Sequence, residues 1–360
     1  MAIIDACAHP VVARPADINA FLAAPYRREQ LNAPGGGSYP VPIDEHVAGS
    51  HPANGSLPGS DPKLMDRDVL LGPNADYAVL LPLTRGLVAD AAFGAAICSA
   101  TNEWLAATWL SEYNSHERYK GSIRVSPRSP RHAVKEIKRW ADHPHFVQVA
   151  VTLESHVAYG EQVYFEIWEA ASDHGLPVAI HADRAGGTLR PPTPQGYPQY
   201  FIEEYSQQPL YAILQLFSLI AHGVFERLNS LVFVFADGGF DYAQTLMWRL
   251  DKEWRSSGSE VPWVAKSPRL YLPDHVRFLA HHGDGAEDPA TFSDFIDRNG
   301  WADLLMYASN YPSWDYLSAD SLTKRLQLPL RSRIMSENAA RLYRLTAGRP
   351  AVPEPVGEEA

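Results

Sequence analysis

Short runs of β-branched and apolar residues alternate with helical stretches along almost the whole chain, and this alternation limits the fold more than any other feature. Strands separated by helices usually pair in parallel, because each helix returns the chain to the same edge of the sheet. About eight runs read as such strands: residues 2–5, 76–81, 121–125, 146–151, 177–181, 231–235, a weak run at 270–272, and 304–308. Eight βα units predict a closed (β/α)8 TIM barrel.

The stretches between these runs carry helical signals. Ser129 followed by Pro130 predicts an N-cap and a first helical residue, with Val134, Ile137 and Trp140 on one face. Further helices are predicted at residues 89–113, 161–174, 207–221, 240–254 and 330–345. We therefore expect a single barrel domain over residues 1–347, followed by a disordered tail at 348–360 that is rich in proline and acids.

Residues 33–66 depart from this pattern, because they are rich in Gly, Pro, Ser and Asn and show no hydrophobic period. Loops that follow barrel strands lie at the face where chemistry occurs, so this insertion is expected to cover the active site. His46 and His51 would then reach substrate, although a solvated loop with two incidental histidines is the more ordinary interpretation. The glycines at 35–37 lack the strand-turn-helix setting of a dinucleotide site.

Composition narrows the class of partner. The chain has 360 residues and a formal net charge of −11, so nucleic acid and anionic membranes would repel it and a small molecule is the expected partner. No apolar run is long enough to cross a bilayer, and the first residues do not resemble a secretion signal. With only two cysteines, Cys7 and Cys98, a cytoplasmic location is expected.

Five polar residues stand at equivalent ends of different predicted strands: Cys7, His9, His181, Asp237 and Asn310. Residues two apart in a strand point the same way, so Cys7 and His9 project together as strand one leaves the barrel. A single polar residue after a strand means little, and a lone His181 would be read as structural. Thiolate and imidazole are good zinc ligands, and a carboxylate can move a proton, so the set predicts the site of a metal-dependent hydrolase or lyase.

The chain resembles the amidohydrolase-2 family, which includes aminocarboxymuconate semialdehyde decarboxylase, aromatic-acid decarboxylases and related hydrolases. The resemblance preserves order along nearly the whole chain. It is carried by residues 4–9 (IDACAH), 102–105 (NEWL), 178–181 (VAIH), 223–227 (GVFER), 238–239 (GG), 246–251 (LMWRLD), 308–312 (ASNYP) and 337–343 (ENAARLY).

The resemblance implies a distorted barrel, often a homodimer, that holds one divalent ion, usually zinc and sometimes manganese. His9 and His181 match the family's ligand histidines. Cys7 stands where the family has His, Glu or Asp, and Asp237 stands where many members have a catalytic histidine. Asn310 replaces the aspartate of a Ser-Asp-Tyr-Pro motif, which is the graver change, because a neutral amide is a poor zinc ligand and no base.

Residues outside this set offer further candidates. Arg184 follows strand five and would clamp a substrate carboxylate, or would simply pair with Asp183 beside it. Trp314 is a candidate for the pocket wall. His222 is expected at the far end of the barrel, and the histidines at 281–282 are reserve ligands that a solvated loop would equally explain.

These observations predict an enzyme, a metal-assisted decarboxylase or hydrolase of a small aromatic or unsaturated carboxylic acid. Zinc would be held by Cys7, His9 and His181, with Asn310 adding at most a weak contact. The catalytic chemistry would fall to Asp237, His181 and Asn310, with Asp237 moving the proton. The alternative is a barrel that has lost the ion and works as a metal-free enzyme or a non-catalytic binding protein.

Overall fold

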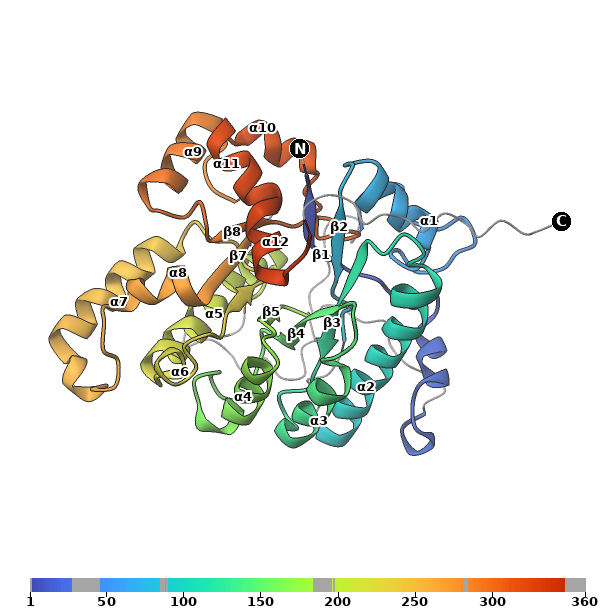
Figure 1. Cartoon of the computed structure of the whole chain (residues 1–360), viewed down its shortest axis with the longest axis horizontal. Helices are drawn as coiled ribbons and strands as arrows, with labels where there is room; N and C mark the ends of the chain where they lie inside the picture. Colours follow the sequence, from blue (N-terminus) through green and yellow to red (C-terminus); the bar gives the residue numbers. More distant parts are fainter. Residues whose placement is uncertain are drawn as a thin grey trace.

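Eight parallel strands form one barrel in a computed structural model that describes residues 2–27, 46–84, 88, 90–183, 196, 198–280 and 284–346 (Figure 1). The strands neighbour one another in chain order. Their bounds are β1 (Ile4–Ala8), β2 (Tyr77–Leu80), β3 (Tyr119–Arg124), β4 (Phe146–Thr152), β5 (Val178–His181), β6 (Phe233–Phe235), β7 (Val276–Ala280) and β8 (Leu305–Tyr307). A parallel bridge between Ala8 and Tyr311 joins the first strand to the chain after the last. The predicted (β/α)8 TIM barrel is confirmed.

Helices surround the barrel, as Figure 1 shows. The α-helices are α1 (Pro62–Met65), α2 (Ala91–Ala107), α3 (Pro130–Trp140), α4 (Phe165–Asp173), α5 (Phe201–Ala221), α6 (Val224–Arg227), α7 (Ala243–Ser257), α8 (Leu272–His275), α9 (Pro289–Arg298), α10 (Ala319–Arg325), α11 (Leu328–Ser332) and α12 (Asn338–Tyr343). Short 3-10 turns occupy η1 (Pro15–Ala20), η2 (Ala24–Tyr26), η5 (Gln162–Tyr164), η6 (Gly258–Glu260) and η7 (Pro268–Tyr271), and π turns occupy η3 (Asp66–Leu71), η4 (Thr108–Glu112) and η8 (Arg333–Glu337). Within the described ranges, no helix is both long and apolar enough to span a membrane.

The seventh strand was predicted in the wrong place. Residues 270–272 lie in η7 and α8, where Pro268 and Pro273 occupy early positions of helical turns. Proline fixes φ near the helical value and has no amide hydrogen to donate to a neighbouring strand. The strand that forms is β7, in which Phe278 is buried on the outer face and Leu279 in the barrel interior.

The insertion after β1 differs in part from its prediction as a loop. Asp61 caps one turn of helix, α1, by accepting a hydrogen bond from the Lys63 amide, with Pro62 at the first helical position. The part of the insertion at 46–61 contacts the chain after β8, because the Val47 amide donates to the Pro312 carbonyl at 2.9 Å. Residues 33–45 and the tail at 348–360 lie outside the described residues, so their predicted roles stay predictions.

The barrel interior is apolar in its middle and polar toward its ends. Val79, Ala150, Ala179, Val234 and Met306 fill the middle from five strands. At the end where the strands begin, the Tyr343 hydroxyl of α12 donates to Gln148 Oε1 at 3.0 Å, and Gln148 Nε2 donates to Ser122 Oγ at 2.8 Å. At the other end the side chains of Cys7, His9, Arg124, His181 and Asn310 are all buried. This second polar layer is the candidate site.

Candidate active site

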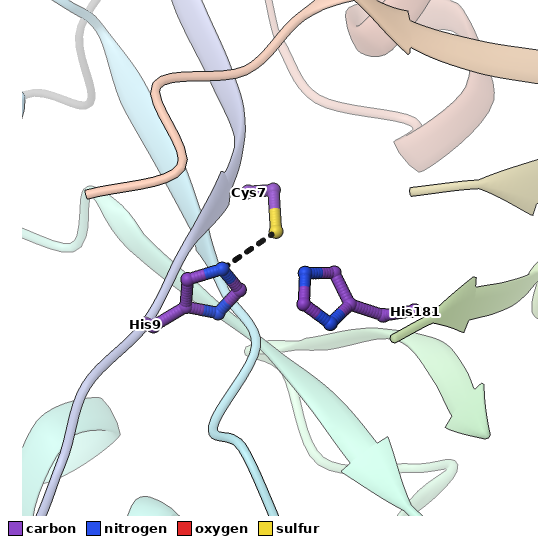
Figure 2. Close-up of side chains that lie close together, drawn as sticks. All are labelled: Cys7, His9 and His181. Carbon is purple, nitrogen blue, oxygen red and sulfur yellow. Dashed lines mark hydrogen bonds between the residues drawn. The ribbon is translucent and has the colours of Figure 1, made fainter. Parts of the chain in front are cut away.

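Cys7, His9 and His181 lie together where β1 and β5 end (Figure 2). One ligand atom from each side chain lies within 4.8 Å of the other two. Cys7 Sγ is 3.8 Å from His9 Nε2, and the two imidazole rings are 4.6 Å apart at an interplanar angle of 63°. All three side chains are buried, so the cluster is a possible metal site with little access to bulk water.

His9 is held as a neutral imidazole with one nitrogen turned toward the cluster. Its Nδ1 lies 2.8 Å from the Leu81 carbonyl, which can only accept, so Nδ1 carries the hydrogen. Burial and the neighbouring His181 ring lower the pKa of His9 to about 4. Near neutral pH, the His9 Nε2 atom therefore presents a lone pair.

Asn310 turns its amide oxygen toward that lone pair. Its Nδ2 donates to Asp315 Oδ1 at 2.7 Å, and the Tyr205 hydroxyl donates to the other oxygen of Asp315. This arrangement fixes the amide so that Asn310 Oδ1 lies 2.6 Å from His9 Nε2. Two electron-pair donors thus face each other at short range, an arrangement that a cation between or beside them would stabilise.

The thiol completes a donor set that fits a divalent ion. Burial, together with the nearby carboxylates of Asp5 and Asp237, raises the pKa of Cys7 well above its ordinary value. Without a cation Cys7 is therefore a neutral thiol, whereas a bound dication would stabilise the thiolate. One sulfur, two imidazoles and an amide oxygen are a plausible set for zinc, with the soft sulfur disfavouring manganese.

A buried ion pair that the sequence did not reveal lies behind His181. Arg124 at the end of β3 donates to Asp183 Oδ2, and both side chains are 0% exposed. The Thr84 amide and hydroxyl also donate to that oxygen, at 2.9 and 3.2 Å. The other oxygen, Asp183 Oδ1, is 3.7 Å from His181 Nδ1, so the carboxylate is placed to orient that ring.

The guanidinium of Arg124 is only partly satisfied. Its Nε and Nη1 atoms are buried and have no hydrogen-bond partner in the described part of the chain. Buried donors without partners are rare in folded proteins and are common where a ligand supplies the acceptor. The sequence left open whether Arg184 clamps a substrate carboxylate or pairs with Asp183; Asp183 pairs with Arg124, and Arg184 lies outside the described residues, so its own role stays a prediction. The sequence signal for Arg124 is its position two residues after Ser122 in β3. Ser122 faces the barrel interior, so Arg124 does as well.

Asp237 stands one residue beyond the buried Ala236 at the end of β6. Its Oδ1 accepts the amide hydrogen of Gly238 at 2.7 Å, and it is close enough to raise the pKa of Cys7. Gly238 and Gly239 both have positive φ, and a Cβ on Gly239 would lie 2.5 Å from an Asp284 oxygen. The glycine pair therefore lets the chain turn sharply and leaves Asp237 at the mouth.

Trp314, in the chain after β8, belongs to an aromatic wall that it forms with α5. Its ring packs against Phe201 and Tyr205 at the start of α5, with centroids 6.0 and 5.0 Å away. Its buried indole nitrogen has no hydrogen-bond partner within the described ranges. A wall with an apolar face and an available donor suits an aromatic ligand that carries an oxygen substituent.

The other histidines considered as candidates fall into three groups. His222 ends α5 with a half-exposed ring 4.0 Å from Glu161, away from the mouth as expected. His46 pairs with Ser313 through an antiparallel bridge, and its ring lies 5.6 Å from that of His51. These two are therefore near the chain after β8, although their part in binding stays a prediction. The residues at 281–282 lie outside the described part.

Comparisons with known proteins agree with this geometry. A model of the amidohydrolase family matches residues 4–345, whereas no curated protein matches the sequence significantly. The structure resembles 5-carboxyvanillate decarboxylase from Sphingomonas paucimobilis, at 19% identity over 96% of this chain and 99% of that chain, with a TM-score of 0.66. It also resembles 2,6-dihydroxybenzoate decarboxylase from Rhizobium, at 16% identity over 96% and 99% of the two chains, with a TM-score of 0.65.

A third similar structure contains ligands. It is 5-carboxyvanillate decarboxylase from Novosphingobium aromaticivorans, complexed with manganese and 4-hydroxy-3-methoxy-5-nitrobenzoic acid. It is 18% identical over 96% of each chain, with a TM-score of 0.67. At these identities the solved structures establish the fold, and the family model spans nearly the whole sequence. This chain belongs to the amidohydrolase family.

Proposed function

We propose that this protein is a metal-dependent decarboxylase of a small aromatic carboxylic acid. The observation that carries the proposal is the buried cluster of Cys7, His9 and His181 at the mouth of an amidohydrolase barrel. Two of the similar structures named above are decarboxylases of hydroxylated benzoates, and another holds manganese with a substituted benzoic acid. These similarities support the substrate class.

Zinc is the proposed ion, held by Cys7, His9 and His181. The Asn310 Oδ1 atom beside His9 is proposed as a fourth ligand. The thiol favours zinc over manganese, because sulfur is a soft ligand. When bound, the ion would stabilise negative charge that develops on substrate oxygens. Asp183 is proposed to support these ligands, because its Oδ1 lies 3.7 Å from His181 Nδ1 and would help to orient that ring.

Arg124 and Trp314 are proposed to bind the substrate. Arg124 has two buried donors without partners, in the same polar layer as His181. A carboxylate or phenolate oxygen would satisfy them, and the charge of the guanidinium would favour the anionic form of the acid. Trp314 offers a ring face and an indole donor from the opposite wall. The earlier candidate for this role, Arg184, remains a second proposal.

Asp237 is proposed to move the proton. In decarboxylation of a hydroxylated benzoate, the ring carbon that bears the carboxylate takes a proton. The bond between that carbon and the carboxylate then breaks, carbon dioxide leaves, and the electron pair of the broken bond restores the aromatic ring. Asp237 lies at the mouth, near Cys7, and would deliver that proton to the ring carbon.

The test combines metal analysis with substrate turnover. Purified protein is analysed for metals, stripped with a chelator, and restored with zinc or manganese. Each form is then assayed with 2,6-dihydroxybenzoate and 5-carboxyvanillate by ultraviolet absorbance and carbon dioxide release. We expect about one zinc per chain, lost activity on stripping and recovery with zinc. Full activity without metal would instead assign the chemistry to Asp237 and His181.

We also infer that the protein is a homodimer and works in the cytoplasm. Helices α5 and α7 pack together, and both expose large apolar side chains, with Leu214 57% and Trp248 53% exposed. Such exposure is typical of surfaces that another protein covers. Light scattering of the purified chain tests the dimer, and Leu214→Glu is expected to shift it toward monomer.

The cytoplasm is inferred from the two free, buried cysteines.

A further inference from the structure

A cavity of about 510 Å³ opens at the end of the barrel opposite the candidate active site. It lies among the residues that precede β5 and β6, the start of β7, and α12, the red helix near the centre of Figure 1. Its lining includes Arg277, Arg341 and Arg344, together with Asn338, and Asp173 is the one acid among the described lining residues. Three guanidinium groups thus border one cavity in a chain whose net charge is −11.

The backbone amide of Arg344 donates to the Ala340 carbonyl, but its guanidinium has no hydrogen bond and no ion pair within the described ranges. Its guanidinium lies against Gly175, where a Cβ would come within 2.8 Å of Nη2. Gly175 has a positive φ and lines the same cavity. The glycine therefore leaves room for an arginine whose charge is not neutralised by a neighbouring acid.

The other two arginines are only weakly compensated. Arg341 Nη1 is 4.0 Å from Asp303, and Arg333 shares the same carboxylate at 3.8 Å. Arg277 is partly buried, and its Nη1 donates to the carbonyls of Pro273 and Val276 at 2.9 and 2.6 Å. Burial and the nearby charge of Arg341 lower the pKa of Arg277. Asp303 is shared by Arg333 and Arg341 and, with Asp274, also acts on Arg277. Positive charges therefore outnumber the acids around them, which favours an anion in the cavity.

Asn338 adds an unsatisfied acceptor to the same cavity. Its Nδ2 donates to the carbonyls of Ala302 and Leu305, both at 2.8 Å, which fixes the orientation of the amide. Its Oδ1 is buried and has no hydrogen-bond partner in the described part of the chain, and the residue is 2% exposed. A buried acceptor in this state is expected to meet a hydroxyl or amino donor from a ligand.

We propose that this cavity is a second binding site, which takes a small organic phosphate bearing hydroxyl groups. The phosphate lies among Arg277, Arg341 and Arg344, whose forked donors match its oxygens. A ligand hydroxyl donates to Asn338 Oδ1. The volume lies within the range of small-molecule sites, and the position is separate from the proposed catalytic chemistry. A ligand there would stabilise the closed end of the barrel formed by α12.

The test is calorimetric titration of the intact chain at low ionic strength with three probes: inorganic phosphate, glycerol 3-phosphate and n-propyl phosphate. We expect saturable binding of glycerol 3-phosphate, with n-propyl phosphate about fivefold weaker because it lacks the hydroxyl donor. Arg344→Gln is expected to weaken binding at least about tenfold. Arg298→Gln, which removes the same charge from an exposed pair with Asp294, is expected to change it less than about twofold.

Several results would overturn the proposal. One is a lack of saturable binding of all three probes up to about 10 mM, which is weaker than small-molecule sites of this volume usually bind. Another is equal affinity for glycerol 3-phosphate in the wild type and in Arg344→Gln. Citrate, titrated in addition to the three probes, would reject the phosphate class if it bound more tightly than either phosphate ester. Thermal melting without ligand shows whether Arg344→Gln is folded, and the comparison of the two esters needs no variant.

Discussion

Replacing Asn310 with aspartate tests whether this side chain belongs to a metal site. Asn310 Nδ2 donates to Asp315 Oδ1 at 2.7 Å, so Asn310→Asp places two carboxyl groups in contact. Even after relaxation to about 4 Å, two unit negative charges repel by about 4 kcal/mol at an effective dielectric constant of about 20. In the metal-free protein we therefore expect a loss of about 2 to 4 kcal/mol in the free energy of unfolding at pH 8.

Acid and zinc should each remove this loss, for different reasons. In the folded variant the two carboxyl groups share a proton, so their joint pKa is raised above that in the unfolded chain. The destabilisation is then present above that pKa and shrinks as the pH falls toward 5. A dication beside His9 would neutralise the added charge, and zinc at a thousandfold excess over its Kd adds about 4 kcal/mol to any protein that binds it only when folded.

The assay is urea unfolding of chelator-treated and zinc-loaded protein at pH 8, and of chelator-treated protein at pH 5.5. Asn102→Asp is the matched control, because Asn102 Nδ2 donates to Glu136 Oε2 at 3.0 Å in a buried setting, and its other hydrogen bonds go to the Arg124 backbone and not to Cys7, His9 or His181. We expect zinc to stabilise Asn310→Asp more than the wild type and to leave Asn102→Asp unrescued. Equal effects of zinc on both variants would refute the placement of Asn310 beside the ion.

Four further results are expected. Cys7→Ser should lose most of its zinc by elemental analysis, whereas Cys98→Ser should keep it. Burial raises the pKa of Cys98 to about 12, and Cys98 does not belong to the cluster of Cys7, His9 and His181. Asp237→Asn should lower kcat by roughly 100-fold to 10,000-fold with unchanged metal content; an unchanged kcat would remove Asp237 from the reaction. Arg124→Lys should raise KM more than it lowers kcat, because lysine keeps the charge but loses the forked donors; a reversed pattern would contradict substrate binding. Burial lowers the pKa of His9 to about 4, so the unfolded chain binds a proton at His9 more tightly than the folded chain does. The free energy of unfolding of metal-free protein should therefore rise by up to about 3 kcal/mol from pH 4 to 6.5. The His9→Gln variant should lose this rise.

Local patterns in the sequence were sufficient for most of the barrel and for part of the site. Cys7 and His9 are two residues apart at the end of a strand, and His181 ends another, so strand periodicity and the parallel order of strands place them at one mouth. The seventh strand was missed because β7 contains Arg277 within an apolar run, whereas the apolar residues at 270–272 lie between two prolines. Composition alone favoured the wrong segment.

Long-range pairing explains what the sequence did not reveal. Arg124 and Asp183 are brought together by the register of β3, β4 and β5, and no short motif records that register. From the sequence, the nearest partner that could be named for Asp183 was its neighbour Arg184, as one of two alternatives. The orientation of Asn310 likewise depends on Asp315 and on Tyr205 from α5, which only the folded chain brings together. Each of these contacts needs the closed barrel before it exists.

The two departures from the expected ligand pattern offset each other in charge for one form of that pattern, histidine at position 7 with aspartate at position 310. A family member with histidine at the position of Cys7 and aspartate at that of Asn310 offers the ion one negative charge, from the end of β8. Here the Cys7 thiolate would supply one negative charge from β1, and Asn310 supplies none. Asp315 keeps a carboxylate behind Asn310 and orients the amide oxygen toward His9. With glutamate or aspartate at position 7 the total charge would differ by one, so it is the donor set of Cys7, His9 and His181 and the orientation of the Asn310 amide that argue for an ion here.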